Sequence, residues 1–332
     1  MRDEKIAFIR VLATIMIVVC HLLQSLSLEA AFWFNLGVQI FFFMSGFLFG
    51  KKDIENIKEW YKRRITKVLI PYIILLVIML LIERIYLNQT YAYKKIFANL
   101  IGFQGFVGCI KTMTHTWFVS YILLAYLITP ILQKIITIEE KSERKFLFSL
   151  ALIAISLFIL QNFKVINIIS AWLFNYILGY YFSRYYIGKE KNYNKFMVTL
   201  LLISIIILII RLPIQYNTFN IKFPKMFLNN LEYIKQWSHV FIGSSLFVLL
   251  YKYLPQIKKK KLLSFFDNES YYIYLTHQIF ILSQFSLIHI TNNLVINIAL
   301  IILASIISAM ILELLTKLFF WILTRNKLKP SS

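Results

Sequence analysis

Long apolar runs alternate with short polar and basic segments along the chain of 332 residues. A run of about 20 apolar residues is long enough to cross the hydrocarbon core of a bilayer as a helix. Lipid offers the backbone no hydrogen-bond partners, so each run is expected to be helical. We therefore predict an all-α integral membrane bundle of about ten transmembrane helices, at residues 6–25, 31–50, 67–87, 116–133, 146–161, 165–183, 196–212, 237–254, 270–289 and 294–322.

No feature of the sequence indicates a boundary between two domains. The apolar runs are not separated by a linker rich in Pro, Gly or Ser, and no internal repeat is visible. Charged residues make up 15% of the chain, compared with about a quarter in a soluble protein. The first run is too long for the core of a signal peptide, so we expect it to be retained. The sequence predicts a single membrane domain over residues 1–332 with no soluble domain appended.

The net charge of +21 is distributed as in a membrane protein. Of the 36 lysines and arginines, 26 lie in one alternating set of segments and 9 in the opposite set. The richer set is 1–5, 51–67, 134–145, 184–195, 252–269 and 317–332. Positive residues favour the cytoplasmic side, so we predict that both termini are cytoplasmic in a multi-pass protein of the plasma (inner) membrane. No basic and aromatic surface module remains, so we expect no nucleic-acid partner.

The first predicted span carries two ionisable residues, Arg10 and His21. Such residues are costly in hydrocarbon and indicate a functional site by default. Eleven helical steps bring the chain back to nearly the same direction, so both residues are expected on one face, about 16 Å apart. Two simpler interpretations stay open. Arg10 could extend to the inner surface, and His21 could be a hydrogen-bonded core residue.

The most basic segment is 51–67, in which apolar residues recur at helical spacing. We predict an amphipathic helix lying on the inner surface and ending near Pro71. Its charge suits contact with anionic lipid. It also suits an anionic cytosolic ligand, because Arg63 and Arg64 can form bidentate contacts with phosphate.

Other polar residues in or beside the spans are candidates for the same site. Gln39 lies near the middle of the second span, and Ser45 is expected at a depth similar to that of Arg10. His115 and Trp117 begin the fourth span, where an aromatic belt is the alternative explanation. His277 lies about 10 Å into the ninth span at helical rise. The two cysteines form no C-x-x-C pair or Cys/His cluster, so we predict no metal site.

Five ordered motifs resemble the acyltransferase family 3 of bacterial membrane proteins, which includes sugar O-acetyltransferases. They are Arg10 and His21 in the first span, GVQIFFFMSGFL at 37–48, Arg63 and Arg64 before Pro71 and Tyr72, His115 with Trp117, Phe118, Tyr126 and Pro130, and SYYIYLTH at 270–277. The resemblance covers most of the chain. One departure is Gln39, where many members carry aspartate.

The resemblance implies a membrane acyltransferase. Its members take an acyl group, usually acetyl, from cytosolic acyl-CoA and transfer it to a hydroxyl, less often an amine, of a cell-surface polysaccharide or a lipid-linked sugar precursor. The acyl-CoA is a donor substrate, and no permanently bound cofactor is implied. This chain would work in the lipid bilayer either alone or with a glycan-assembly or extracytoplasmic transferase partner.

The resemblance also implies roles for individual residues. His21 would act as a general base or carry the acyl group briefly, and Arg10 would bind or stabilise negative charge. Arg63, Arg64 and Ser45 would bind the donor. Supporting roles would fall to Gln39, His115, Trp117, Tyr126 and His277.

Two other classes of protein are compatible with the pattern. A transporter or flippase of a polysaccharide precursor would also have many spans and polar residues on one helix face. A non-catalytic membrane scaffold explains the spans but requires neither Arg10 nor His21. Transfer of a labelled acetyl group by the purified protein would favour the enzyme, and movement of an unmodified lipid-linked sugar would favour the flippase.

Overall fold

The computed structural model describes residues 3–139, 143–162, 170–186, 190–216, 225–255, 257 and 261–325. These residues form helices joined by turns and loops, and no strand occurs among them. Parts of the predicted segments 1–5, 134–145, 165–183, 184–195, 252–269 and 317–332 lie outside the described residues. The described chain divides into two compact units, one with Met1–Ala13, Asn35–Glu55 and Ile128–Lys259 and one with Thr14–Phe34, Asn56–Leu127 and Lys260–Ser332.

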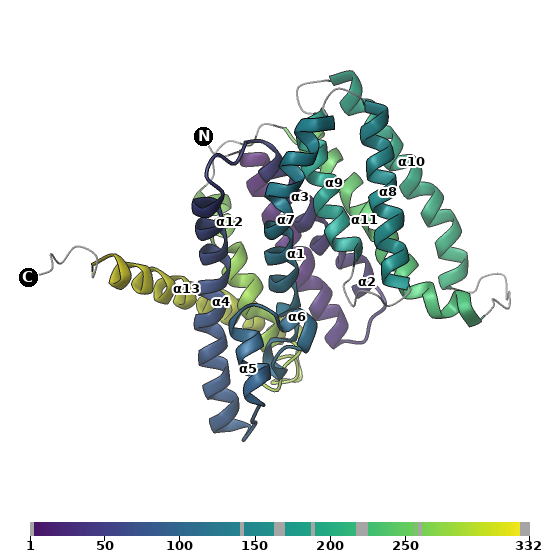
Figure 1. Cartoon of the computed structure of the whole chain (residues 1–332). Helices are drawn as coiled ribbons and strands as arrows, with labels where there is room; N and C mark the ends of the chain where they lie inside the picture. Colours follow the sequence, from purple (N-terminus) through teal and green to yellow (C-terminus); the bar gives the residue numbers. More distant parts are fainter. Residues whose placement is uncertain are drawn as a thin grey trace, which may run out of the picture. The chain divides into compact units, whose positions relative to one another are not determined.

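The first unit is a group of long helices. It holds the start of α1 (Glu4–Ser25), the end of α7 (Trp117–Glu139), α3 (Leu36–Gly50), α8 (Glu143–Asn162), α9 (Ser170–Tyr186), α10 (Glu190–Gln215) and α11 (Lys225–Tyr253). Helices α3 and α9 lie against each other, as do α10 and α11 (Figure 1). A Cβ atom built on Gly46 or on Gly179 would lie 2.0 Å from a backbone oxygen of the facing helix. The two backbones approach this closely because glycine has no side chain.

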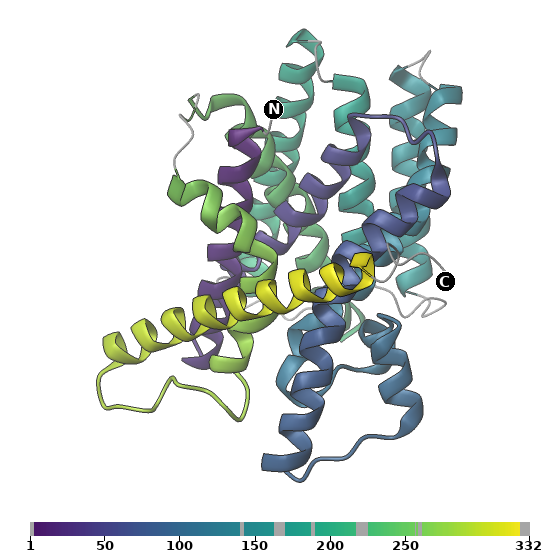
Figure 2. The same cartoon turned by 90° about the vertical axis from the view of Figure 1, so that its left-hand side faces the viewer.

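The second unit mixes long helices with short ones. It holds the rest of α1 and α7, α2 (Ala31–Phe34), α4 (Ile57–Tyr86), α5 (Tyr93–Leu100), α6 (Gln104–Val107), the 3₁₀ turn η1 (Lys111–Thr116), α12 (Lys261–Thr276), the 3₁₀ turn η2 (His277–Phe280) and α13 (Leu294–Arg325). Helix α13 packs on α4, α12 and η2. Figure 2 shows α13 in yellow and the loop that joins it to η2.

Six helical stretches in the described part of the chain are long and apolar enough to cross a membrane. They are Glu4–Ser25, Ala31–Gly50, Ile57–Tyr86, Lys111–Ile135, Tyr193–Gln215 and Leu294–Arg325. Each contains most of a predicted span, at 6–25, 31–50, 67–87, 116–133, 196–212 and 294–322. The chain is therefore an all-helical protein with several membrane-spanning helices, while the full number of ten stays a prediction.

The prediction that the basic helix ends near Pro71 is wrong. Residues Ile57–Tyr86 form one helix of 30 residues, and Pro71 lies inside it. Asn56 caps its start, with the Asn56 side chain accepting a hydrogen bond from the backbone N–H of Glu59. Thirty residues extend about 45 Å, more than the roughly 30 Å of hydrocarbon. The basic first turns are thus a continuation of the span.

The ninth predicted span, 270–289, is also wrong as a continuous helix. The α-helix ends at Thr276, and the chain continues through η2 into a loop that reaches α13. Hydroxyl groups compete for the backbone there: Ser283 accepts a bond from Phe285 N, and Ser286 accepts one from Ile288 N. Side chains of this type commonly replace helical hydrogen bonds by local ones. His277 therefore lies at the end of an α-helix and not in the middle of one.

Candidate active site

Three histidines meet inside the second unit, although they come from α1, η1 and η2. The Nδ1 atom of His21 lies 2.8 Å from Nε2 of His277, with an angle of 4° between the two rings. His115 lies edge-on to both, with ring centroids 6.2 Å from His21 and 5.2 Å from His277. His277 and His115 are buried, at 0% and 3% exposure, while His21 is partly exposed. His21 is thus the histidine that a ligand can reach.

The break at the end of α12 fixes the orientation of His277. Its Nδ1 atom lies 3.0 Å from the carbonyl oxygen of Ile273 and 2.8 Å from that of Tyr274. Both carbonyls belong to the last turn of α12, where helical carbonyl groups lack partners within the helix. The imidazole satisfies these carbonyls with one edge and presents its other nitrogen to His21.

Gln278 holds η1 and η2 together around His115. Its Oε1 atom accepts hydrogen bonds from the backbone N–H of His115 at 2.9 Å, from Nδ1 of His115 at 2.6 Å and from the hydroxyl of Thr114 at 3.0 Å. The hydroxyl of Tyr274 donates to the backbone oxygen of His115 over 2.7 Å. His115 is consequently a buried, anchored residue and not part of an exposed aromatic belt.

A buried carboxylate positions the start of η1. Glu83, at 0% exposure, accepts hydrogen bonds from the backbone N–H and hydroxyl of Thr112, at 2.8 and 2.5 Å, and from the hydroxyl of Tyr91 at 2.5 Å. Burial and the neighbouring carboxylate raise the pKa of Tyr91 to about 12, so Tyr91 remains a neutral donor. Charge-assisted bonds of this kind are stronger than neutral ones. Glu83 thereby fixes the turn that carries His115.

Sequence reasoning missed Glu83, Tyr274 and Gln278. Glu83 carried a usable signal, because it is an ionisable residue inside an apolar run, the same property that marked Arg10. Gln278 follows His277 directly and forms a polar pair with it in an otherwise apolar stretch. Tyr274 lies within the motif SYYIYLTH at 270–277, but nothing in the sequence distinguished it from the other aromatic residues of the spans.

The remaining predicted site residues fall into two groups. Arg10 belongs to the first unit, on the same helix as His21 and three turns before it. Gln39 and Ser45 lie on α3, also in the first unit, where Gln39 is buried and bonded to Asn175. None of these three is among the residues that surround His21 within the second unit.

The other predicted residues belong to the second unit. Tyr126 contacts Trp60, with ring centroids 6.1 Å apart. Trp117 contacts Tyr121, with ring centroids 6.0 Å apart. On the basic half of α4, Arg63 has a side chain that is 67% exposed and lies 3.5 Å from the carboxylate of Glu59. Exposed pairs contribute little energy, so Arg63 can exchange Glu59 for a ligand.

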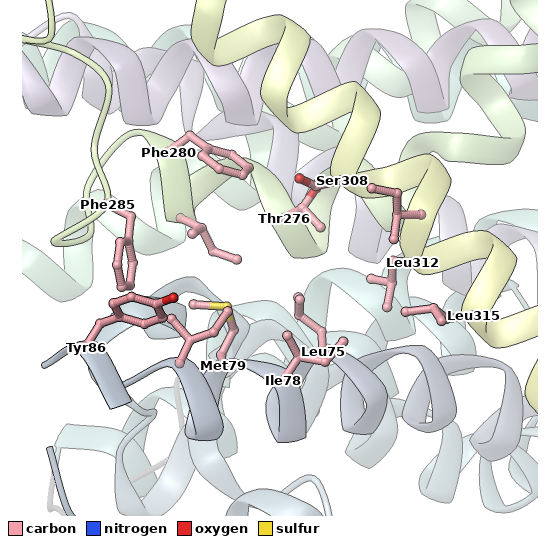
Figure 3. A pocket seen from close by; sticks show the side chains of 13 residues that line it. Leu75, Ile78, Met79, Tyr86, Thr276, Phe280, Phe285, Ser308, Leu312 and Leu315 are labelled. Atoms are coloured by element: carbon pink, nitrogen blue, oxygen red, sulfur yellow. The ribbon is translucent and has the colours of Figure 1, made fainter. Parts of the chain in front are cut away.

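An apolar groove of about 400 Å³ lies between α4, η2 and α13. Its lining includes Leu75 and Met79 from α4, Thr276 and Ile279 on either side of His277 and Gln278, and Leu312 from α13 (Figure 3). These five are all less than a tenth exposed, whereas the rim residues Tyr86 and Ile311 are 74% and 53% exposed. The groove therefore has a buried floor against the segment that carries His277 and opens at the surface.

Among the described residues, no group of three or more His, Cys, Asp or Glu is arranged to hold a metal ion. The site is instead a set of hydrogen-bonded imidazoles in a bundle of apolar helices. Imidazole is the side chain that most often serves as a general acid or base in enzymes.

Comparison with known proteins identifies the class. The sequence model of the acyltransferase domain of the acyltransferase 3 family matches residues 3–314, nearly the whole chain. The chain belongs to this family, as its five motifs predicted, and is accordingly a membrane acyltransferase. No curated protein matches it, and no solved structure does.

Proposed function

We propose that this acyltransferase moves an acyl group, acetyl in the first instance, from cytosolic acyl-CoA to a hydroxyl of a cell-surface polysaccharide or its lipid-linked sugar precursor. An amine is the alternative acceptor group. The observation that carries the proposal is the partly exposed His21, bonded to the buried His277, in a chain of this family. An imidazole with one anchored nitrogen is suited to general-base catalysis.

The proposed reaction is a direct transfer. The imidazole of His21 takes the proton from the acceptor hydroxyl as its oxygen attacks the thioester carbonyl carbon. The C–S bond breaks, and the departing thiolate of CoA receives the same proton from His21. One C–O bond replaces one C–S bond, and the proton ends on the CoA thiol. Transfer through an acyl-imidazole on His21 would yield the same products in two steps.

Basic residues would bind the donor. Arg63 and Arg64, near the start of α4, would contact the phosphates of CoA at the cytoplasmic surface, with Ser45 assisting. Burying phosphates in hydrocarbon is far more costly than burying a neutral thioester, so only the acyl end would enter the bundle. Arg10 would stabilise the negative charge that develops on the thioester oxygen. This arrangement uses the predicted topology of ten spans, in which segment 51–67 and both termini face the cytoplasm.

The groove in the second unit suits the hydrocarbon chain of a lipid-linked acceptor. Helices α4 and α13, which form its two sides, are candidate spans whose most apolar windows are only 28% and 22% buried within the protein. Their outer faces would therefore meet lipid. The floor contains Thr276 and Ile279, which flank His277 and Gln278 in sequence. A chain in this groove would bring its polar head towards the histidines.

The test is acyl transfer by purified protein in lipid vesicles. Labelled acetyl-CoA is supplied together with a lipid-linked oligosaccharide, and the label is followed into the acceptor. Label in an ester on the sugar supports the proposal. Movement of the unmodified lipid-linked sugar across the vesicle, without any acyl transfer, would contradict it and favour a flippase.

A further inference from the structure

The two rings of the His21–His277 pair have unequal roles that follow from their partners. A carbonyl oxygen can only accept a hydrogen bond. Since Nδ1 of His277 lies 3.0 and 2.8 Å from the carbonyl oxygens of Ile273 and Tyr274, this nitrogen must carry a hydrogen. A neutral imidazole has one such hydrogen, so Nε2 of His277 is an acceptor.

The state of His21 follows from that of His277. Nε2 of His277 accepts at 2.8 Å from Nδ1 of His21, which therefore carries the hydrogen of the His21 ring. The remaining nitrogen of His21, Nε2, then has a free electron pair. His277 is fully buried, whereas His21 is partly exposed. His21 is therefore the ring of the pair that a substrate can reach.

We propose that His277 is a positioning residue that selects the Nδ1–H form of His21 and so presents Nε2 of His21 as the base. This proposal rests on the proposed function and specifies how the base is prepared. The buried carboxylate of a Ser-His-Asp triad does the same for its histidine, holding the tautomer and stabilising the imidazolium. Here a neutral imidazole, locked by two helix-end carbonyls, takes the place of the carboxylate.

A neutral partner suits the surroundings of His277. A carboxylate at this position would face the carbonyl oxygens of Ile273 and Tyr274, and two acceptors repel each other. An unpaired charge would also be costly in a fully buried position. The imidazole donates to the carbonyls on one edge and accepts from His21 on the other, which neither a carboxylate nor an aliphatic side chain can do.

Two substitutions separate the two edges of His277. In His277→Asn the amide nitrogen can occupy the place of Nδ1 and still donate to the carbonyls, but nothing remains at the place of Nε2. In His277→Gln the longer side chain puts Oε1 near the place of Nε2, where it accepts from His21.

We expect His277→Asn to lower kcat about 10- to 100-fold, as is usual for the loss of an orienting partner, with an unchanged KM for acetyl-CoA. His277→Gln should restore kcat to within about tenfold of the parent, and His289→Asn, at an exposed position in the next loop, should match the parent.

A spectroscopic measurement tests the proposal without relying on activity. The ¹⁵N shifts of labelled histidine distinguish Nδ1–H from Nε2–H, and the chain has only five histidines. The His21 signals, assigned by their loss in His21→Gln, should show Nδ1–H in the parent and in His277→Gln and lose that preference in His277→Asn. An Nε2–H form of His21 in the parent would overturn the proposal. So would an Nδ1–H form that persists in His277→Asn. Absence of acyl transfer in the parent would instead refute the proposed function, and the spectra would still decide the role of His277.

Discussion

The side-chain amide of Asn175 donates hydrogen bonds to the backbone oxygen of Gln39 at 2.6 Å and to its Oε1 atom at 3.0 Å. The Oδ1 atom of Asn175 in turn accepts a bond from the hydroxyl of Ser244 at 2.7 Å. All three residues are at most 1% exposed; Ser244 lies on α11, which packs on α3 and α9. Gln39, a polar residue of α3, is thus part of a bridge between three helices.

Breaking this bridge should destabilise the protein. Asn175→Leu would leave Oε1 of Gln39 and the hydroxyl of Ser244 buried without partners, at about 1–3 kcal/mol for each unsatisfied group. We expect a lower thermal unfolding midpoint in detergent. Thr199→Ala serves as the control, because this exposed hydroxyl bonds within its own helix, to Lys195 O. An unchanged midpoint in Asn175→Leu would show that the bridge does not stabilise the bundle.

Loss of the proposed base should affect turnover more than donor binding. His21→Ala removes the imidazole that accepts the proton, so we expect acetyl transfer to fall about a hundredfold or more, the usual contribution of a general base. Binding of acetyl-CoA, measured on the same preparation, should change little. Arg10→Lys keeps the charge but loses the planar guanidinium, and it should also be impaired. Transfer at the parent rate in His21→Ala would remove this residue from the mechanism.

Replacing the two arginines at the start of α4 should weaken donor binding. In the Arg63→Ala, Arg64→Ala double variant we expect the KM for acetyl-CoA to rise about tenfold or more, since each charged contact is worth about 1.5–3 kcal/mol. The value of kcat should change by a smaller factor than KM, because the lost contacts bind the substrate and the transition state equally. Arg84→Ala, an exposed arginine at the other end of the same helix, is the matched control. Equal KM values in both variants would place the CoA phosphates elsewhere.

Filling the groove should distinguish lipid-linked from soluble acceptors. Ser308→Phe introduces a ring into the lining of the groove (Figure 3), whereas Ile307→Phe changes its neighbour, which is 48% exposed and outside the lining. We expect Ser308→Phe to lower transfer to a lipid-linked acceptor about tenfold, which corresponds to ~1.4 kcal/mol. Transfer to a short soluble acceptor should be preserved. Equal loss with both acceptors would mean that the groove does not hold the lipid chain.

The contact between α3 and α9 should tolerate no side chain at its glycines. In Gly46→Ala the new Cβ atom would lie 2.0 Å from Tyr176 O, so the helices must move apart. Overpacking of this kind costs about 1–3 kcal/mol or more, and the unfolding midpoint in detergent should fall. Ala151→Val, at an exposed position on α8, should be nearly neutral. A parent-like midpoint for Gly46→Ala would contradict the close approach of the two backbones.

The membrane character, several spans and the family were all predictable from the sequence, because each depends on local order along the chain. The length of an apolar run decides whether it can span a bilayer. The Arg10–His21 pair was recognisable because eleven residues is close to three helical turns, and α1 is indeed one continuous helix. The same local rules failed at Pro71, which lies inside a continuous helix, and at Thr276, where the α-helix gives way to a 3₁₀ turn.

The candidate site itself was decided by the tertiary structure. His277 lies 256 residues after His21 in sequence, and no periodicity relates the two. Their contact accompanies the packing of Val18 and Leu22 of α1 on buried Ile281, just after η2, while Gln278 joins η2 to the turn carrying His115. Hydrophobic periodicity reports which face of a helix is buried, but not which distant side chain it meets there. The sequence therefore determined that His21 is an unusual residue within a span, and only the folded chain determined that its partner is an imidazole fixed by the carbonyl groups of a helix end.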